Sequence, residues 1–143
     1  MKISTITLIS VLIISFPGQS QELIWNVLTD TTGIYGAGDL QVDNQDNIYI
    51  SGGSQNITLL KLDKNGSIQY VVSDPTEASV REMILADNGK IFVAGNRKSA
   101  VTNQDALLQV YEEEDLLFEQ LYDYTGRDDK FSKICVDDEN NIY

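Results

Sequence analysis

The sequence contains no histidine and only one cysteine among its 143 residues. Without histidine, the chain has no Ser-His-Asp or Cys-His nucleophile pair and no metal site that uses an imidazole ligand. The single cysteine, Cys135, forms no intramolecular disulfide, so no bridge staples the fold. Its neighbours Ile134 and Val136 indicate a strand, where a free cysteine usually acts as a small buried hydrophobe. These absences exclude the commonest nucleophilic and metal-binding arrangements.

Basic residues are also scarce. The chain has 10 Lys and Arg against 22 Asp and Glu, which gives a formal net charge of −12. Binding to nucleic acid or to anionic lipid needs clustered Lys and Arg side chains that face phosphate groups. We therefore expect no nucleic-acid partner, and we interpret the acidic balance mainly as a well-solvated surface.

Only one long apolar run is present, from Ile3 to Phe16. It follows Met1-Lys2 and precedes Pro17-Gly18, which is the layout of a secretory signal peptide. Its 14 residues fall short of the roughly 20 that span a bilayer. We predict a signal peptide over residues 1–20 and a mature chain that starts near Gln21, is secreted or held at the cell surface, and does not insert into a membrane. A buried N-terminal helix or a retained anchor is the alternative.

What the sequence does contain is an internal repeat. Three stretches each combine an acidic, turn-forming cluster with an aromatic-centred apolar run: Asp43 to Gly52 (DNQDNIYISG), Asp87 to Gly95 (DNGKIFVAG) and Asp137 to Tyr143 (DDENNIY). Asn, Asp and Gly accept left-handed backbone, which a tight hairpin requires. An apolar stretch precedes each cluster, so each copy predicts a strand, a tight turn and a second strand.

Two further strands complete each repeat. The expected third strands are residues 58–63 and 106–111, and the expected fourth strands are residues 67–72 and 115–120. A lone copy of the fourth strand lies at residues 22–28. Trp25, Tyr70 and Phe118 hold the same place in these fourth strands, 45 and then 48 residues apart. Repeats of 40 to 50 residues with four short strands each are typical of β-propeller blades.

The sequence therefore predicts an all-β fold, an incomplete β-propeller built of four-stranded antiparallel blades. We divide residues 21–143 into the last strand of a blade (21–32), two full repeats (33–78 and 79–126) and the start of another (127–143). Residues 107–121 also fit an amphipathic helix. The strand assignment is favoured because the equivalent stretch of the first repeat holds the turn residues Asp63-Lys64-Asn65-Gly66.

On these motifs the chain resembles the SBBP-type β-propeller repeats of secreted bacterial proteins. The matching residues are Asp43, Asn47, Ile48, Tyr49, Ile50, Gly52, Lys61, Leu62, Asp63, Gly66, Asp105-Ala106 and, as the closing aromatic, Trp25. The chain departs from the pattern at Asp46, where glycine is usual, and at Glu112 to Asp115, where another turn is expected. The resemblance implies an extracellular repeat module, often a stalk or binding part of a larger protein, and it implies no catalytic residues.

Few residues suggest a site. The acids of Asp43 to Asp46 and of Asp137 to Glu139 are interpreted as hairpin turns rather than calcium loops, since their spacing matches no EF-hand. The four acids of Glu112 to Asp115 are interpreted as a solvated turn. Arg97 and Lys98 fall in a loop predicted over residues 96–105, which is four residues longer than its counterpart, and they are the best candidates for binding. We expect no catalytic, cofactor or metal residues.

The function predicted from the sequence is that of an exported, non-enzymatic module for binding or for scaffolding, as the N-terminal fragment of a larger protein. Its ligand would be a protein or a carbohydrate. A fragment of a propeller-type hydrolase or lyase is one alternative, and a sensor ectodomain is another. Strands 39–42, 81–86 and 133–137 should line up at the channel of the ring. Two acids together with Arg81 at that place would favour the enzyme.

Overall fold

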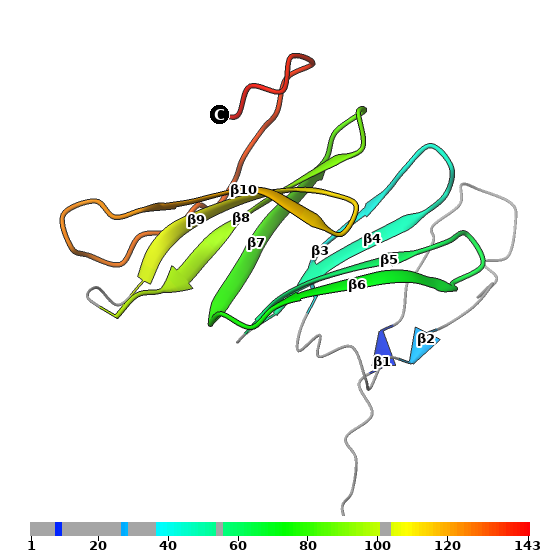
Figure 1. Cartoon of the computed structure of the whole chain (residues 1–143), viewed down its shortest axis with the longest axis horizontal. Helices are drawn as coiled ribbons and strands as arrows, with labels where there is room; N and C mark the ends of the chain where they lie inside the picture. Colours follow the sequence, from blue (N-terminus) through cyan, green and yellow to red (C-terminus); the bar gives the residue numbers. More distant parts are fainter. Residues whose placement is uncertain (1–7, 10–26, 29–36, 54–55, 101–103) are drawn as a thin grey trace, which may run out of the picture.

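The computed structural model describes residues 8–9, 27–28, 37–53, 56–100 and 104–143, and two four-stranded antiparallel sheets make up most of this part (Figure 1). The first sheet contains, in spatial order, β3 (Ala37–Val42), β4 (Ile48–Gly52), β5 (Ile57–Leu62) and β6 (Ile68–Asp74). The second contains β7 (Ala78–Leu85), β8 (Lys90–Lys98), β9 (Gln104–Glu112) and β10 (Asp115–Tyr122). The all-β prediction is confirmed, and strands replace the alternative helix over residues 107–121.

The two sheets repeat the same strand order and the same irregularities of strand pairing. Each is a meander in which every strand pairs with the next in the chain. A β-bulge inserts one extra residue in the first strand of each sheet, at Gly38 and at Arg81, which lie 43 residues apart. A second bulge lies in the fourth strands, at Gln69 and at Leu117. Because bulges rarely recur by chance at matching places, the repeat seen in the sequence is also a repeat in the register of the sheets.

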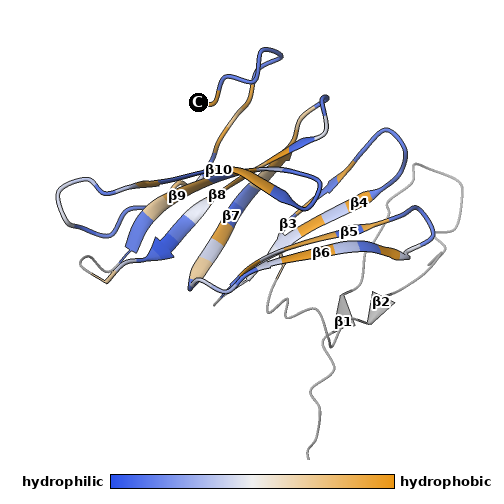
Figure 2. Cartoon of the chain, viewed as in Figure 1, coloured by the Kyte–Doolittle hydropathy of each residue, from blue (hydrophilic) through white to orange (hydrophobic). Residues whose placement is uncertain are grey.

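The sheets pack face to face, with β7 beside β3. Their shared core combines apolar side chains from the facing sides of both sheets: Tyr49, Ile57, Leu59, Ala78, Val80, Met83, Ile91, Val93, Leu107 and Tyr111. Burial of this kind stabilises a fold by about 25 cal/mol per Å² of apolar surface. Figure 2 shows the complementary pattern, with apolar residues along the strands and hydrophilic residues at the turns. The central strands are apolar on both faces, which explains why their sequences alternate poorly.

The third copy of the motif begins in the segment that follows the second sheet. Its turn is closed by a bridge between Val136 and Ile142, and the backbones of Cys135 and Tyr143 exchange two hydrogen bonds. Cys135, however, is exposed, so the prediction that it is buried is wrong. The physical reason is that a hairpin of this size has no second layer over it among the described residues.

Two short strands lie outside the two sheets. β1 (Leu8–Ile9) pairs with β2 (Val27–Leu28) in an antiparallel pair. β2 is the end of the predicted strand over residues 22–28, and β1 falls within the predicted signal peptide. The rest of both segments, with Trp25, lies outside the described residues, so these assignments stay predictions. The described residues also hold no helix with the length and apolar character needed to cross a bilayer.

The hairpin turns explain why acidic residues recur in the repeat. The Asp43 carboxylate accepts hydrogen bonds from the backbone amides of Gln45 and Asn47, both at 2.8 Å, from the Asn47 side chain at 2.8 Å, and from the Tyr49 hydroxyl at 3.3 Å. Asp137 makes the same set of bonds in the third copy, with Asn141 and Tyr143 in the matching places. These acids therefore order their own turns, which is the turn interpretation made from the sequence.

The second turn keeps the backbone geometry and replaces the side chains. In the second turn the Ala86 amide donates to the Lys90 carbonyl, and the Gly89 amide donates to the Ala86 carbonyl. In the first turn the amide of Asp43 donates to the carbonyl of Asn47, and the amide of Asp46 donates to the carbonyl of Asp43. The residue that corresponds to Asp43 is therefore Ala86, one place earlier than the alignment on Asp87 implies. Gly89 has φ 83°, and Asp46 adopts the same left-handed backbone with φ 64°, which only glycine, asparagine and aspartate accept readily.

The three side chains of the first turn should act as one unit. We expect Asp43→Ala to lower the free energy of unfolding by about 1 kcal/mol, because several donors lose their acceptor. The triple variant D43A/N47K/Y49F, which introduces the three matching side chains of the second turn, should cost less than D43A alone. Urea unfolding followed by circular dichroism measures both, with Asp87→Ala as the control. A triple variant that is less stable than D43A would contradict this account.

Candidate functional site

The structure moves the two residues proposed for binding out of their loop. Arg97 and Lys98 are the last residues of β8, in register with Asp105 and Gln104 of β9. The prediction that they lie in a loop over residues 96–105 is therefore wrong, because strand pairing continues to Gln104. Lys98 is exposed and forms an ion pair with Glu77 at 3.0 Å. Arg97 is only 8% exposed.

Arg97 belongs to a polar cluster between the two sheets, which we call the Arg97 cluster: Asp74, Arg97, Gln109, Tyr111 and Glu119. Asp74 ends β6 of the first sheet, and the other four residues belong to the second sheet. The Arg97 guanidinium contacts Asp74 through Nη2 at 2.5 Å, and it contacts Glu119 through Nη1 at 2.6 Å and Nη2 at 2.8 Å. The cluster thus joins the sheets by a charge-assisted contact at the edge of their apolar core.

Gln109 connects the two carboxylates a second time. Its Nε2 donates to Asp74 at 3.1 Å and to Glu119 at 2.7 Å, while its Oε1 accepts from the Tyr111 hydroxyl at 3.0 Å. The tyrosine therefore fixes the orientation of the amide. Burial raises the pKa of the Tyr111 hydroxyl above its usual range, so it remains a donor. All of these contacts hold Asp74 and Glu119 in their ionised forms.

The pKa directions agree with this geometry. Burial alone would raise the pKa of Asp74, but hydrogen bonds from Thr76 and Gln109 and the charge of Arg97 outweigh it and lower the pKa below its usual value. The hydrogen bond from Arg97 is the main cause that lowers the pKa of Glu119. The pKa of Arg97 is raised, because its bonds and charges outweigh the cost of burial.

A cleft of about 390 Å³ opens beside the cluster, lined by Asp74, Arg97, Tyr111 and Glu119 among others. Two carboxylates at such a place suggest glycoside hydrolysis, which needs one of them protonated to donate to the leaving group. Here both carboxylates have lowered pKa values and share the same two donor groups. The pair therefore lacks the proton donor of that reaction, and its geometry is that of a joint between sheets.

A second polar cluster lies along β3 and β7, which are edge strands of the two sheets, and along residues 131–136. The Asp39 carboxylate accepts a hydrogen bond from the backbone amide of Met83 at 2.9 Å. The Glu82 carboxylate accepts one from the backbone amide of Ile134 at 2.5 Å and a second from Lys133 Nζ at 2.6 Å. The three segments expected to line up at a channel thus do approach one another, and Lys133 rather than Arg81 supplies the cation.

The two carboxylates of this cluster hold equivalent places in the repeat. Asp39 and Glu82 each follow the bulge of their strand, and each bonds to the repeat that follows it. Lys133 has the same position in the third copy. We call the bond from each carboxylate to the next backbone the inter-repeat clamp. The sequence shows an acid nine residues before Ile48 and another nine residues before Ile91. It does not show that each acid bonds to the backbone of the next repeat.

The remaining acidic candidates lie at the turns. Glu112 pairs with Asp115 across a two-residue turn in which Glu113 has φ 53°, and all four acids are exposed. Glu113 also lines a groove of about 420 Å³ between the turns at Asp43 and Asp87. Within the described ranges, no three Asp, Glu or Cys side chains are grouped so that they could hold a metal ion.

No protein-family model matches the chain, and no curated protein matches it.

Substitution of Arg97 should show how much the repulsion between Asp74 and Glu119 lowers the stability of the fold. We expect Arg97→Leu to lower the free energy of unfolding by about 2 kcal/mol, since it leaves the half-buried Asp74 and the more exposed Glu119 without their cation. Lys98→Ala is the matched control and should change it by less than about 0.5 kcal/mol, because that ion pair is exposed.

The same variant should change the dependence of stability on pH. Because the pKa values of Asp74 and Glu119 are lowered in the folded chain, their stabilisation is present above their unfolded pKa values and is lost as the pH falls through the folded ones. Between neutral pH and about pH 3, Arg97→Leu should therefore lose less stability than the native chain. An identical pH profile for the two proteins would contradict this assignment.

The inter-repeat clamp predicts a local change in amide exchange. We expect Asp39→Ala to speed the hydrogen exchange of the Met83 amide by about tenfold, because that amide loses its acceptor. Asp39→Asn keeps a carbonyl acceptor and should retain most of the protection. NMR measures the exchange rate of the Met83 amide in each variant. Asp128→Ala, at an exposed position, is the control. An unchanged Met83 amide in Asp39→Ala would show that the clamp does not form.

Proposed function

We propose that the chain is an exported, non-enzymatic repeat module of the β-propeller kind that serves in binding or as a scaffold. The observation that carries this proposal is the inter-repeat clamp. It bonds the first sheet to the second and the second to the start of a third copy, at the same position each time. A link that repeats in this way arranges successive sheets around a common inner edge, which is the principle of a propeller.

The resemblance to the SBBP-type repeats supports the same reading. The residues that carry it have identifiable structural roles: Asp43, Asn47 and Tyr49 order the first turn, and Asp63 accepts hydrogen bonds from the backbone of Asn65 and Ser67. The polar clusters further support a role in binding or as a scaffold, because their carboxylates form the bonds that join the sheets. The enzyme alternative would need an acid poised to give up a proton, and neither Asp74 nor Glu119 fits that need.

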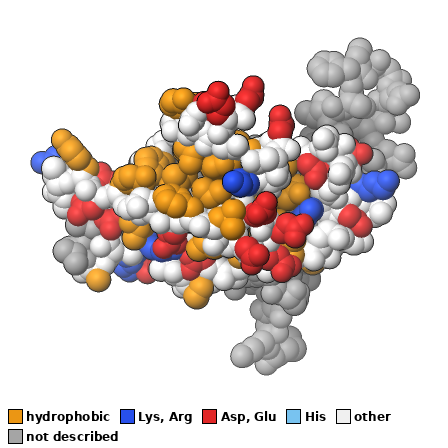
Figure 3. Space-filling model, turned by 45° about the horizontal axis from the view of Figure 1, so that its top comes forward, with side chains coloured by type: hydrophobic (Ala, Val, Ile, Leu, Met, Phe, Trp, Pro, Cys, Tyr) orange, Lys and Arg blue, Asp and Glu red, His pale blue; other side chains and the backbone are white. Residues whose placement is uncertain are grey.

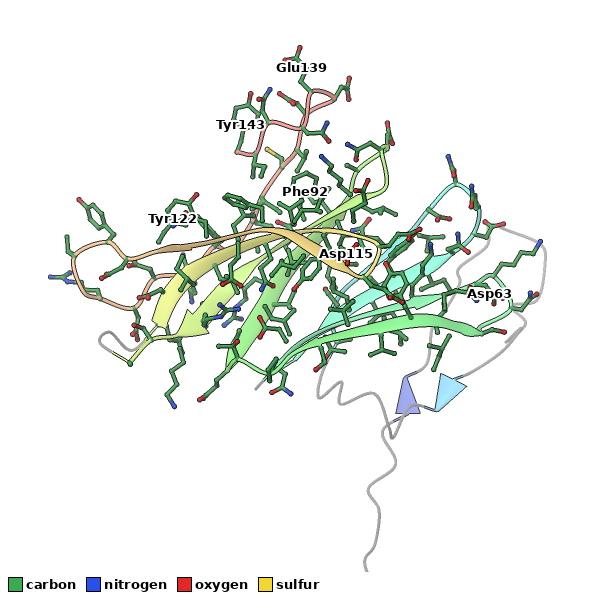
Figure 4. The ribbon with its side chains drawn as sticks, in the orientation of Figure 1. Asp63, Phe92, Asp115, Tyr122, Glu139 and Tyr143 are labelled. Carbon is green, nitrogen blue, oxygen red and sulfur yellow. The ribbon has the colours of Figure 1, made fainter. Side chains whose placement is uncertain are left out.

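Binding by such a module would use the end of the sheets where the turns gather, which we call the hairpin end. Its turns carry half of the 22 acids of the chain: Asp43, Asp46, Asp63, Asp87, Glu112, Glu113, Glu114, Asp115, Asp137, Asp138 and Glu139. Figure 4 shows Asp63, Asp115 and Glu139 at three of these turns. Loops on a rigid sheet scaffold commonly carry binding surface. Lys98, at the opposite end of β8, stays a weaker candidate for contact with a protein or a carbohydrate.

Export is the part of this proposal that can be tested first. We expect residues 1–25, fused to a reporter enzyme without its own signal, to send that reporter out of the bacterial cytoplasm. Mass spectrometry of the exported protein should show an N-terminus near Gln21, because the apolar run of residues 3–16 is recognised and the peptide then removed. A fusion that begins at Gln21 is the control and should stay inside the cell. A reporter retained inside the cell with Met1 intact would overturn the export proposal.

A further inference from the structure

A groove opens at the hairpin end, between the first turn at Asp43 and the second turn at Asp87. It has a volume of about 420 Å³, and its lining includes residues of both turns together with Tyr49, Lys61 and Glu113. Small-molecule sites in proteins commonly enclose roughly 300–1,000 Å³. Figure 3 brings the top of Figure 1 forward and shows acidic side chains gathered at this end, with basic side chains among them. The groove thus has the size of a ligand site and carries charges of both signs.

The cation of the groove is Lys61, which lies in β5 in register with Tyr49 of β4 and Tyr70 of β6. Its ammonium group lies over both rings, 5.1 Å from the centre of the Tyr49 ring and 5.8 Å from the centre of the Tyr70 ring. Within the part of the chain that the structure describes, this ammonium group has no ion pair and no hydrogen bond. Since an ammonium group has three donors, Lys61 can donate to a ligand in the groove.

The hydroxyl of Tyr70 is a second donor without a partner. The residue is 9% exposed and its hydroxyl oxygen is buried, yet no described residue forms a hydrogen bond with it. Burial is the main cause that raises the pKa of this hydroxyl, and Tyr49, Glu113 and Glu114 raise it further. The hydroxyl therefore keeps its proton, and it lies close enough to Glu113 of the groove to be affected by that charge. A buried hydroxyl without a partner costs about 1–3 kcal/mol, so its presence needs an explanation.

The second repeat shows that the fold does not require these polar groups. The strand register places an apolar side chain at each of the three positions that match Tyr49, Lys61 and Tyr70: Phe92, Val110 and Phe118. The strands of the second sheet pair in the same order with these side chains. The ammonium group of Lys61 and the hydroxyl of Tyr70 are therefore additions to a sheet that forms without them, and a role in binding explains why both are present.

The groups around the groove determine the class of ligand. Lys61 and Tyr70 offer donors, whereas the exposed carboxylates of Asp87 and Glu113 offer only acceptors. An anionic ligand would be repelled by these carboxylates, and a cationic ligand would be repelled by the ammonium group. A hydroxyl group both donates and accepts. A neutral ligand with several hydroxyl groups can therefore bond to both kinds of group at once.

We propose that this groove binds a neutral pyranose sugar, whose hydroxyl groups accept hydrogen bonds from Lys61 and Tyr70 and donate to Asp87 and Glu113. The inference rests on the proposed function, because it names the ligand class of the binding module and the place where that ligand lies. The Tyr49 hydroxyl takes no part, since it donates to Asp43 and belongs to the first turn.

NMR titration of the chain tests the ligand class. The probes are the methyl glycosides of glucose, galactose and mannose, each added up to roughly 50 mM. We expect at least one of them to shift the amides of Lys61 and Asp87, with a Kd on the order of 1 mM. The uronate and the amino sugar with the same ring should bind several-fold more weakly, because each adds a charge that the groove repels. If no neutral glycoside shifts these amides, or if the uronate binds more tightly, the proposal is wrong.

Two buried tyrosines separate binding from stability. Tyr70→Phe should weaken sugar binding by about tenfold, because one hydrogen bond to the ligand is lost, and it should not lower the urea midpoint. Tyr111→Phe is the matched control, since the Tyr111 hydroxyl bonds to Gln109 at 3.0 Å. It should lower the urea midpoint and leave the sugar affinity unchanged. If Tyr70→Phe lowers the urea midpoint and leaves the affinity unchanged, its hydroxyl is structural and the proposal is wrong.

A variant of the cation completes the test and separates this inference from the function on which it rests. Lys61→Met keeps the apolar stem, removes the donors, and should also weaken sugar binding by about tenfold. If a sugar binds but neither Lys61→Met nor Tyr70→Phe weakens it, the site is elsewhere, so this inference fails while the binding module stands. If a glycoside binds in the groove and releases methanol, the groove inference holds and the non-enzymatic proposal fails.

Discussion

The arrangement of this chain depends on a carboxylate that accepts a hydrogen bond from the backbone of the next repeat. Asp39 does this for Met83, and Glu82 does it for Ile134. A sheet edge normally presents unpaired amide groups that would pair with another strand. Here a side chain satisfies one such amide, that of Met83, so the two sheets meet at the edge strands β3 and β7 without merging into one sheet. The contact lies beside the apolar core that the two sheets share, to which Met83 itself belongs.

Polar groups in the interface between the sheets occur in complementary sets. Asp74 lies opposite Arg97, Gln109 and Glu119, so both Nη atoms of Arg97 and the amide of Gln109 meet a partner there, whereas the buried Nε of Arg97 has none. The first turn shows the same rule on a smaller scale, since Asp43, Asn47 and Tyr49 are present together and Ala86, Lys90 and Phe92 replace them together. Loss of one member alone would leave a donor or an acceptor unpaired, which costs more than loss of the whole set.

The strands could be predicted from the sequence because the repeat aligns one copy with another. That alignment decided between helix and strand over residues 107–121, where the apolar pattern alone fits both. It did not settle the register of the second turn, because Asp87-Asn88 imitates Asp43-Asn44 while Ala86 occupies the place of Asp43. Arg97 and Lys98 were assigned to a loop over residues 96–105, which is longer than its counterpart in the first repeat, and only the pairing with Gln104 and Asp105 shows that the strand continues. Both errors concern contacts that local sequence does not encode.

The polar clusters could not be predicted from the sequence, because their members come from distant parts of the chain. Asp74 and Arg97 are 23 residues apart and belong to different sheets, and Asp39 and Met83 are 44 apart. A repeat alignment compares equivalent positions within sheets, whereas these bonds join unlike positions across the interface between sheets. Differences between copies therefore carry information that their similarities lack. Asp74 meets Arg97 and Gln109 of the second sheet, whereas Tyr122 at the matching place contacts Phe131 instead, so this difference between the copies reflects what each position contacts.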